Sequence, residues 1–185
     1  MVFLGIALYT FIGVVLIQVI FYLNIFGRFA FLKQNASNKM ASTPVSVLVC
    51  AKNEAENLKA FLPSITNQEY SNFEIVLIND ASCDDTLEVM EHFASQYQNI
   101  KIVNVKHLET FWGNKKYPLT LGIKAATHNV LLFTDADCKP VSKHWVSTMV
   151  SHLNSEKSIV LGYGAYTKVK NSFLNKIIRF ETLTT

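Results

Sequence analysis

The sequence predicts an α/β fold in which a mostly parallel sheet, covered by helices, follows one transmembrane helix. Three observations support this prediction: an uncharged apolar N-terminal segment, short apolar runs typical of buried strands, and helical spacing between those runs. Strands and helices that alternate with short links favour right-handed βαβ units and a parallel sheet. With 50% hydrophobic and 17% charged residues, the chain is also more apolar than an ordinary soluble domain.

The first expected element is a transmembrane helix. No charged residue occurs from Val2 to Gly27, and about 20 apolar residues are enough to cross the hydrocarbon core of a bilayer. A cleavable signal peptide is the alternative, but its apolar region would be shorter and would follow basic residues, which are missing here. Basic residues come afterwards, at Arg28, Lys33 and Lys39, so the positive-inside rule places the following domain in the cytoplasm.

We therefore expect a membrane protein with a single-pass N-terminal anchor. Residues 1–32 form the helix and its flank, residues 33–43 a polar tether, and residues 44–185 one domain with its own core. The three cysteines, Cys50, Cys83 and Cys138, lack paired or metal-type spacing and fit reduced thiols. The net charge of +3 is spread along the chain without a basic run interleaved with aromatics, so nucleic acid is not an expected partner.

The spacing of apolar residues defines the elements of this domain. Strands are expected at 45–51, 73–78, 100–105 and 130–134, because each is a short, nearly continuous apolar run. The helices between them are expected to bury one face each. Their buried faces are Leu58, Phe61, Leu62 and Ile65 in the first helix (about 54–67), Leu87, Met90, Ala94 and Tyr97 in the second, and Leu119, Gly122, Ile123 and Ala126 in the third.

Polar or acidic residues directly follow three of the four strands. They are "KNE" at 52–54, "NDAS" at 79–82 and "DADC" at 135–138. Ligands of parallel sheets bind at the carboxyl ends of the strands, so these segments are expected to share one site. The dinucleotide fingerprint, the P-loop and the nucleophile elbow are all absent from the sequence.

Asp135 and Asp137 are the candidates for a metal site. Side chains two residues apart on a strand point to the same face, so both carboxylates could meet one cation while Ala136 turns away. Oxygen ligands favour Mg²⁺ or Mn²⁺, which completes its shell with water and substrate phosphates. The alternative is that one aspartate caps the next helix and the other is solvated. The position at the end of a strand favours the metal and a diphosphate.

The acidic segment after the second strand has a structural explanation for most of its residues. Ser82 can cap the following helix, with Asp84 and Asp85 in the first turn, where carboxylates meet the positive end of the helix dipole. Asp80 leaves the strand before this cap. Its carboxylate could accept a hydrogen bond from a nucleobase, and a purely structural role is the equal alternative.

Lys115 and Lys116 stand at the start of the third expected helix. Cations at a helix N-terminus oppose the dipole, and a bound diphosphate would remove that conflict. A solvated lysine pair is the alternative. Pro118 is tolerated here because first-turn N–H groups have no helical partner.

Four segments, taken together, resemble the nucleotide-binding half of a family 2 glycosyltransferase, whose GT-A fold has a Rossmann-like sheet with helices on both faces. They are "VSVLVCAKNEAENL", "FEIVLINDASCDDT", "GNKKYPLTLGIKAAT" and "LLFTDADCKP", in the family's order. The resemblance implies a nucleotide-diphosphate sugar donor, with a UDP-sugar as the first expectation, and a divalent cation. It also implies hexosyl transfer with inversion to a polysaccharide or lipid-linked acceptor.

The resemblance assigns a role to each matching residue. Asp80 would recognise the base, Lys115 would lie on the phosphate side, Asp135 near ribose and metal, and Asp137 would be the direct metal ligand. The base would be flanked by Ala51, Asn53 and Glu54. The chain departs from the family's pattern at Asn79 and Ala81, where the family has Asp and Gly.

The family's catalytic base, a carboxylate well downstream of the Asp-x-Asp segment, has no evident counterpart. Only Glu156 and Glu181 follow Asp137, and neither lies in a matching motif. We expect the base to lie outside this chain, and a nucleotide-sugar-binding module without transfer activity is the alternative. Residues 168–185 are expected to form a basic amphipathic helix that lies in a membrane interface or packs against further structure.

Overall fold

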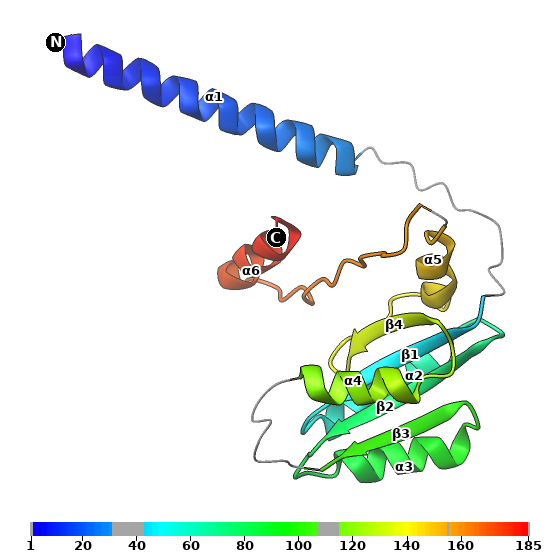
Figure 1. The fold of residues 1–185 in the computed structure, drawn as a ribbon. Coiled ribbons are helices and arrows are strands. Elements are labelled where there is room, and N and C mark those ends of the chain that lie inside the picture. Colours follow the sequence, from blue (N-terminus) through cyan, green and yellow to red (C-terminus); the bar gives the residue numbers. More distant parts are fainter. Residues whose placement is uncertain (1, 31–42, 107–114, 155, 185) are drawn as a thin grey trace. The chain divides into compact units, whose positions relative to one another are not determined.

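The computed structural model describes residues 2–30, 43–106, 115–154 and 156–184 (Figure 1). The chain divides into two compact units, Met1–Ser37 and Asn38–Thr185. The tether expected at 33–43 lies outside the described residues except for its last position, and so do Lys33, Lys39 and the "GN" of the third matching segment.

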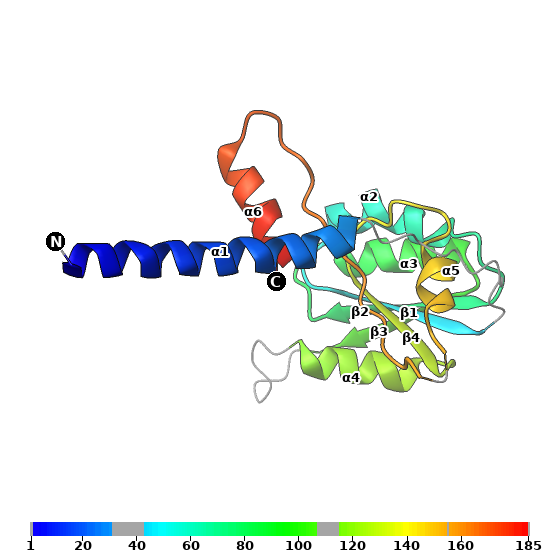
Figure 2. The ribbon, with the colours of Figure 1, turned by 90° about the horizontal axis from the view of Figure 1, so that it is seen from above.

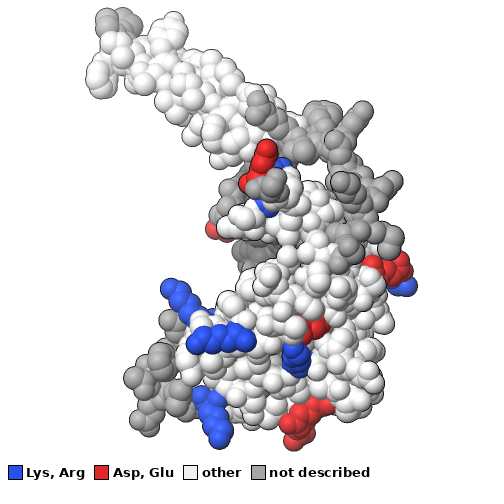
Figure 3. Space-filling view, turned by 45° about the vertical axis from the view of Figure 1, so that its right-hand side comes forward, with Lys and Arg blue, Asp and Glu red and all other residues white. Residues whose placement is uncertain are grey.

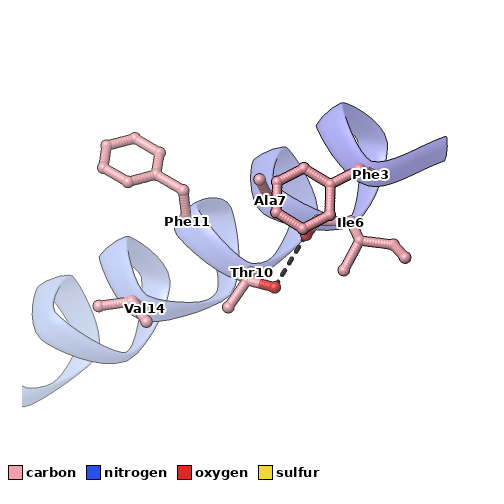
Figure 4. Close-up of a pocket in the computed structure, with 6 residues that line it drawn as sticks. All are labelled: Phe3, Ile6, Ala7, Thr10, Phe11 and Val14. Atoms are coloured by element: carbon pink, nitrogen blue, oxygen red, sulfur yellow. Dashed lines mark hydrogen bonds between the residues drawn. The ribbon is translucent and has the colours of Figure 1, made fainter. Parts of the chain in front are cut away.

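The described residues of the first unit form one helix, α1 (Val2–Ala30). Its segment Phe3–Gly27 is long and apolar enough to cross a membrane, with 25 residues and a mean hydropathy of 2.4. The segment Phe3–Gly27 contains no charged residue, and the part of it that Figure 3 shows is uncharged. Figure 4 shows a hollow along it in which the Thr10 hydroxyl donates to the Ile6 carbonyl at 2.8 Å. That bond satisfies the hydroxyl within the helix. The hollow is lined by Phe3, Ile6, Ala7, Thr10, Phe11 and Val14.

The second unit contains a four-stranded parallel sheet in the order β3-β2-β1-β4, which confirms the predicted fold class. Its strands are β1 (Val45–Ala51), β2 (Phe73–Asp80), β3 (Ile100–Val105) and β4 (Val130–Asp135). Its helices are α2 (Ala55–Thr66), α3 (Thr86–Gln96), α4 (Lys116–Ala125), α5 (Trp145–Ser151) and α6 (Phe173–Thr184). Each predicted strand is present, and β2 and β4 extend to the aspartates that end them.

Helices cover both faces of this sheet, and Figure 2 shows α4 on the face opposite α2 and α3. Val47 and Val49 of β1 point into the core under α2, α3 and α5, whereas Leu48 and Cys50 point into the core under α4. Every residue of β1 is buried. Burial on both faces is the reason that this strand is an unbroken apolar run rather than an alternating one.

The predicted buried face of the third helix is wrong in part, because Ile123 of α4 is 43% exposed. The centre of the buried face is Gly122, where an added Cβ would lie 2.2 Å from Cδ1 of Ile78. Ile123 lies about 100° further around the helix and points away from the sheet. In α3 the buried residues are Thr86, Val89, Met90 and Phe93, so only Met90 of the predicted set is fully buried.

A buried carboxylate, Glu74, lies at the amino edge of the sheet. It accepts hydrogen bonds from the Ser46 hydroxyl (2.6 Å), the Thr127 backbone N–H (2.5 Å) and the Thr127 hydroxyl (2.9 Å). Lys101 pairs with it at 2.8 Å, and the Ser46 oxygen also accepts from the His128 N–H at 3.1 Å. Burial alone would raise the pKa of Glu74, but the bonds from Lys101, Ser46 and Thr127 outweigh it and hold this pKa at about 2.

Candidate functional site

The order of the strands defines where a ligand can bind. The chain runs from β1 outward through β2 to β3 and then crosses back to place β4 on the other side of β1. Open parallel sheets bind ligands at such a switch point, beyond the carboxyl ends of the strands. Here the switch point lies between β1 and β4. Their last residues are Ala51 and Asp135, and Asp135 is the register partner of Cys50.

Two ion pairs occupy this carboxyl edge. Lys52 Nζ lies 3.7 Å from Asp80 Oδ2, and Lys115 Nζ lies 2.5 Å from Asp135 Oδ1. Cys50 lies among them at the end of β1. Burial is the main cause that raises the pKa of its thiol to about 11, and all four charged groups act on it electrostatically. The structure therefore brings Asp80, Lys115 and Asp135 to one edge, as the sequence predicts for ligand-binding residues.

Lys115 is the N-cap residue of α4, directly before Lys116, and its side chain is about half exposed. Partial burial would lower the pKa of Lys115, but its hydrogen bond with Asp135 outweighs that effect and raises the pKa. The conflict between a cation and the helix N-terminus is thus compensated by a carboxylate of the chain itself. Because the pair is open to solvent, an anionic ligand can compete with Asp135 for this lysine.

Asp135 and Asp137 do not both lie on a strand, so the prediction that they are neighbours on one face of a strand is wrong. Asp135 is the last residue of β4, whereas Asp137 lies in a turn closed by the Cys138 N–H, which donates to the Asp135 carbonyl at 3.1 Å. Ala136 is 5% exposed and packs into the core, so it does turn away from the two carboxylates. Neither aspartate caps the next helix, since α5 begins at Trp145 with His144 as its N-cap.

The donor set at this turn fits a hard divalent cation. Both carboxylates are exposed and supply oxygen ligands, which suit Mg²⁺ or Mn²⁺. Within the described parts of the chain, no three His, Cys, Asp or Glu side chains gather into a metal-holding group. The remaining ligands of such a cation would therefore come from water or from phosphate oxygens.

The loops that follow β1 and β2 are joined by hydrogen bonds. The Asn53 N–H donates to the Ser82 hydroxyl at 3.0 Å, and the Cys83 N–H donates to the Asn53 side-chain oxygen at 2.8 Å. The Glu54 N–H donates to the Thr86 hydroxyl at 2.8 Å. Asn53 has φ 56°, a left-handed conformation that asparagine tolerates. These bonds fix the two loops relative to each other beside Asp80.

The capping role predicted for Ser82 is wrong. Helix α3 begins at Thr86, its N-cap is Asp85, and the Asp85 side chain forms no cap hydrogen bond. Ser82 lies too far upstream and accepts from the neighbouring loop instead. Asp84 precedes the helix rather than lying in its first turn, and it accepts from the N–H groups of Ala55 (3.3 Å) and Thr86 (3.1 Å).

Two further predicted residues have limited access to a ligand. Ala51 is 1% exposed and belongs to the core. Glu54 is partly buried, and its carboxylate accepts from the Asn57 side chain at 2.6 Å. Contacts of these residues with a base stay predictions.

Ala81 has φ 48°, in the left-handed region that disfavours a Cβ. Its N–H donates to the Val105 carbonyl at 3.1 Å, and the next N–H, of Ser82, donates to the Asn79 side chain at 3.2 Å. Asn79 is 3% exposed and also donates to Asn104 at 2.9 Å. The turn that follows Asp80 is therefore held in a strained conformation by its neighbours.

Lys52 was expected at the site only as part of the "KNE" segment, with no role of its own, and Cys50 was not expected there. The structure gives Lys52 a specific partner, because its ammonium pairs with Asp80. Cys50 gives no signal in the sequence, because a buried thiol at the end of a strand has the same pattern as any core residue.

The family model and the similar proteins all indicate glycosyltransferases. The family model described as "Glycosyl transferase family 2" matches residues 46–184. Glycosyltransferase AglE of Haloferax volcanii is 30% identical over 112 residues, which are 60% of this chain and 35% of that protein. An uncharacterized glycosyltransferase of Haemophilus influenzae is 32% identical over 127 residues, 68% of this chain and 37% of that protein. The chain thus spans about a third of the length of these two relatives.

Solved structures show the same architecture. The mannosyltransferase PcManGT from Pyrobaculum calidifontis, in complex with GDP-Man and Mn²⁺, has a TM-score of 0.58 at 24% identity, over 71% of this chain and 38% of that one. That likeness shows the fold alone. Residues 1–349 of Staphylococcus aureus TarS, in complex with UDP-GlcNAc, have a TM-score of 0.51 at 27% identity, over 59% of this chain and 30% of that one.

Proposed function

The chain belongs to glycosyl transferase family 2, and from this premise we propose that its carboxyl edge binds a nucleotide-diphosphate sugar. The supporting observation is that the ion pairs Lys52–Asp80 and Lys115–Asp135 flank the end of β1 at the switch point of the sheet. A UDP-sugar is the proposed donor, and the TarS complex with UDP-GlcNAc supports this choice. The reaction is hexosyl transfer, with inversion, to a polysaccharide or lipid-linked acceptor.

The base binds beside Asp80 in this proposal. The Asp80 carboxylate can accept a hydrogen bond from an N–H of the base. The ion pair with Lys52 holds that carboxylate in place. Asn53 and Glu54 lie in the loop that is joined to the turn after Asp80, so they flank the base, with Ala51 beneath them at the end of β1.

The diphosphate binds between Lys115 and the two aspartates of the β4 turn. Asp135 and Asp137 would hold a Mg²⁺ or Mn²⁺ ion, whose chemistry is to neutralise the charge of the departing nucleoside diphosphate. Lys115 adds a second cation at the start of α4. When phosphate oxygens arrive, Lys115 can turn from Asp135 toward them, which leaves a carboxylate oxygen free. A charge-assisted bond to phosphate replaces the bond to the carboxylate, so the exchange costs little.

The last part of the proposal concerns the position of the chain at a membrane. Helix α1 serves as a single-pass anchor in this proposal, and the basic residues that follow its apolar segment favour a cytoplasmic second unit. The catalytic base stays unassigned. A module that binds nucleotide sugars without transfer is the alternative, and acceptor-dependent consumption of the donor would exclude it.

Calorimetric titration of the full chain in detergent micelles tests the site. Uridine, guanosine and thymidine diphosphates are compared with and without Mn²⁺. We expect tighter binding with Mn²⁺ and loss of that dependence in Asp137→Asn. The matched control is Glu91→Gln, which removes an exposed carboxylate on α3 and should bind as the parent does. Equal Mn²⁺ dependence in Asp137→Asn and in the parent would contradict the assignment.

A further inference from the structure

Helix α6 presents an exposed apolar face. The helix has a defined start, since the Ser172 hydroxyl accepts from the Asn175 N–H at 3.1 Å. Phe173, Leu174 and Ile177 fall on one side of the helix and are 76%, 67% and 47% exposed. Large apolar side chains that gather on one face mark a contact surface rather than a solvated one.

The same region is basic. Lys168, Lys170, Lys176 and Arg179 lie within or just before α6, and Glu181 is the one acidic residue from 168 to 185. Lys170 and Lys176 are exposed. An apolar face combined with lysines and arginines fits the boundary between acyl chains and anionic headgroups.

The segment before α6 has the composition of an interfacial segment as well. Leu161, Tyr163 and Tyr166 are 91%, 59% and 59% exposed. Tyrosine is enriched where membrane meets water, because its ring is apolar and its hydroxyl polar. The side chain of Asn175 ties this segment to the helix, with bonds to the Val169 N–H (3.0 Å) and the Thr167 carbonyl (3.1 Å).

The covalent connection to α1 keeps a membrane within reach. Helix α1 ends at Ala30 and β1 begins at Val45. Chain of that length spans at most about 50 Å when fully extended. A short tether raises the effective concentration of the second unit at the surface, so even a weak interfacial helix would be bound most of the time.

We propose that α6 lies in the interface of the membrane that α1 spans, with Phe173, Leu174 and Ile177 toward the acyl chains and the lysines toward anionic headgroups. The proposal rests on α1 as an anchor. It goes beyond the proposed sugar-nucleotide site, because it names a second membrane contact that would hold that unit at the lipid surface.

Site-directed spin labelling of the full chain in vesicles tests this placement. In a Cys83→Ser, Cys138→Ser background, nitroxides are attached at Leu174→Cys, Ile177→Cys and, as a control on the other side of α6, Thr182→Cys. Cys50 is 7% exposed and can stay. In vesicles of phosphatidylcholine and phosphatidylglycerol, we expect oxygen to reach the labels at 174 and 177 better than a water-soluble nickel chelate does, and the reverse at 182.

Charge gives a second, independent readout. Lys170→Gln and Lys176→Gln should each lower the equilibrium constant between the membrane-bound and free states of α6 about fivefold when phosphatidylglycerol is present, and much less in pure phosphatidylcholine. Nickel access at 174 and 177 equal to that at 182 would overturn the proposal. So would exclusion of both relaxation agents from 174 and 177, because that means burial against protein, either more of the chain or a second copy. Calorimetric nucleotide binding reports separately on the proposed function.

Discussion

The two edges of the sheet hold their charged side chains in opposite ways. At the amino edge the Glu74 side chain is 9% exposed and is surrounded by Ser46, Thr127 and Lys101. At the carboxyl edge the Asp135 side chain is 58% exposed and pairs with Lys115, which is itself 52% exposed. Both edges lie on the same strands, so the difference comes from the residues and not from the fold.

The difference separates a stabilising group from one that is available to a ligand. A buried carboxylate must be fully hydrogen-bonded, and such a network fixes the elements that supply its donors. An exposed ion pair contributes little to stability, because solvent screens it. Its members can therefore change partners at low cost, which is what binding of a charged ligand requires.

The largest expected effect follows from removing the buried carboxylate. Glu74→Ala leaves the Ser46 hydroxyl and the Thr127 N–H without their acceptor, so we expect the free energy of unfolding to fall by about 3 kcal/mol. Urea unfolding of the full chain in micelles, monitored by tryptophan fluorescence, measures this free energy of unfolding. The control is Glu69→Ala, which removes an exposed carboxylate paired with Lys143 at 3.8 Å and should cost less than about 1 kcal/mol. Equal losses in the two variants would contradict the comparison.

The pH dependence of stability gives a second test of Glu74. Its pKa is lowered from 4.5 to about 2 in the folded chain. A lowered carboxylate pKa stabilises the fold above the unfolded pKa, and the contribution is lost as pH falls through the folded pKa. We expect parent and Glu74→Gln to differ by about 3 kcal/mol near neutral pH, and the gap to close progressively below pH 4.5. If the difference in unfolding free energy stayed constant down to pH 2, ionisation of Glu74 would not be its source.

The sequence predicts the carboxyl edge better than the amino edge. Parallel strands must end at a common edge, so Asp80 and Asp135 could be placed together from their positions after apolar runs. Glu74 could not, because its partners Ser46 and Thr127 are 28 and 53 residues away along the chain and meet it only in the folded sheet. The loop-to-loop bond of Ser82 was missed for the same reason, because a tertiary partner overrides the local capping pattern. The turn that holds Asp137 was missed because a local bond from Cys138 to Asp135 ends the strand at Asp135.

A substitution at Lys115 tests whether this lysine can exchange Asp135 for a phosphate ligand. Lys115→Gln removes the cation that pairs with Asp135 and that we propose for the diphosphate. We expect about a tenfold loss of nucleoside diphosphate affinity, the size of one charge-assisted hydrogen bond, with a change in unfolding free energy below about 1 kcal/mol. Without nucleotide, Mn²⁺ should bind this variant more tightly, because the lysine no longer competes for Asp135. Calorimetry measures both ligands, and Lys124→Gln on the last turn of α4 is the control. Weaker Mn²⁺ binding in Lys115→Gln would show that the two cations do not compete.

The smallest expected effect concerns the strained turn after Asp80. Ala81 has φ 48°, and a left-handed alanine costs about 1–2 kcal/mol relative to glycine, part of which returns as the greater freedom of glycine in the unfolded chain. Ala81→Gly should therefore raise the free energy of unfolding by about 1 kcal/mol. Asn53→Gly, at φ 56°, is the contrast, because asparagine tolerates this conformation and its side chain accepts from the Cys83 N–H. That variant should lose stability.

If the strain at Ala81 serves the site, stability and binding should move in opposite directions in Ala81→Gly, because a freer turn holds Asp80 less firmly. The measurements are urea unfolding and titration with uridine diphosphate on the same preparation. A variant that gains stability and binds as tightly as the parent would show that the strain has no role in binding. A variant that loses stability would show that the turn is not strained, and the contrast between the two edges would then rest on their charged side chains alone.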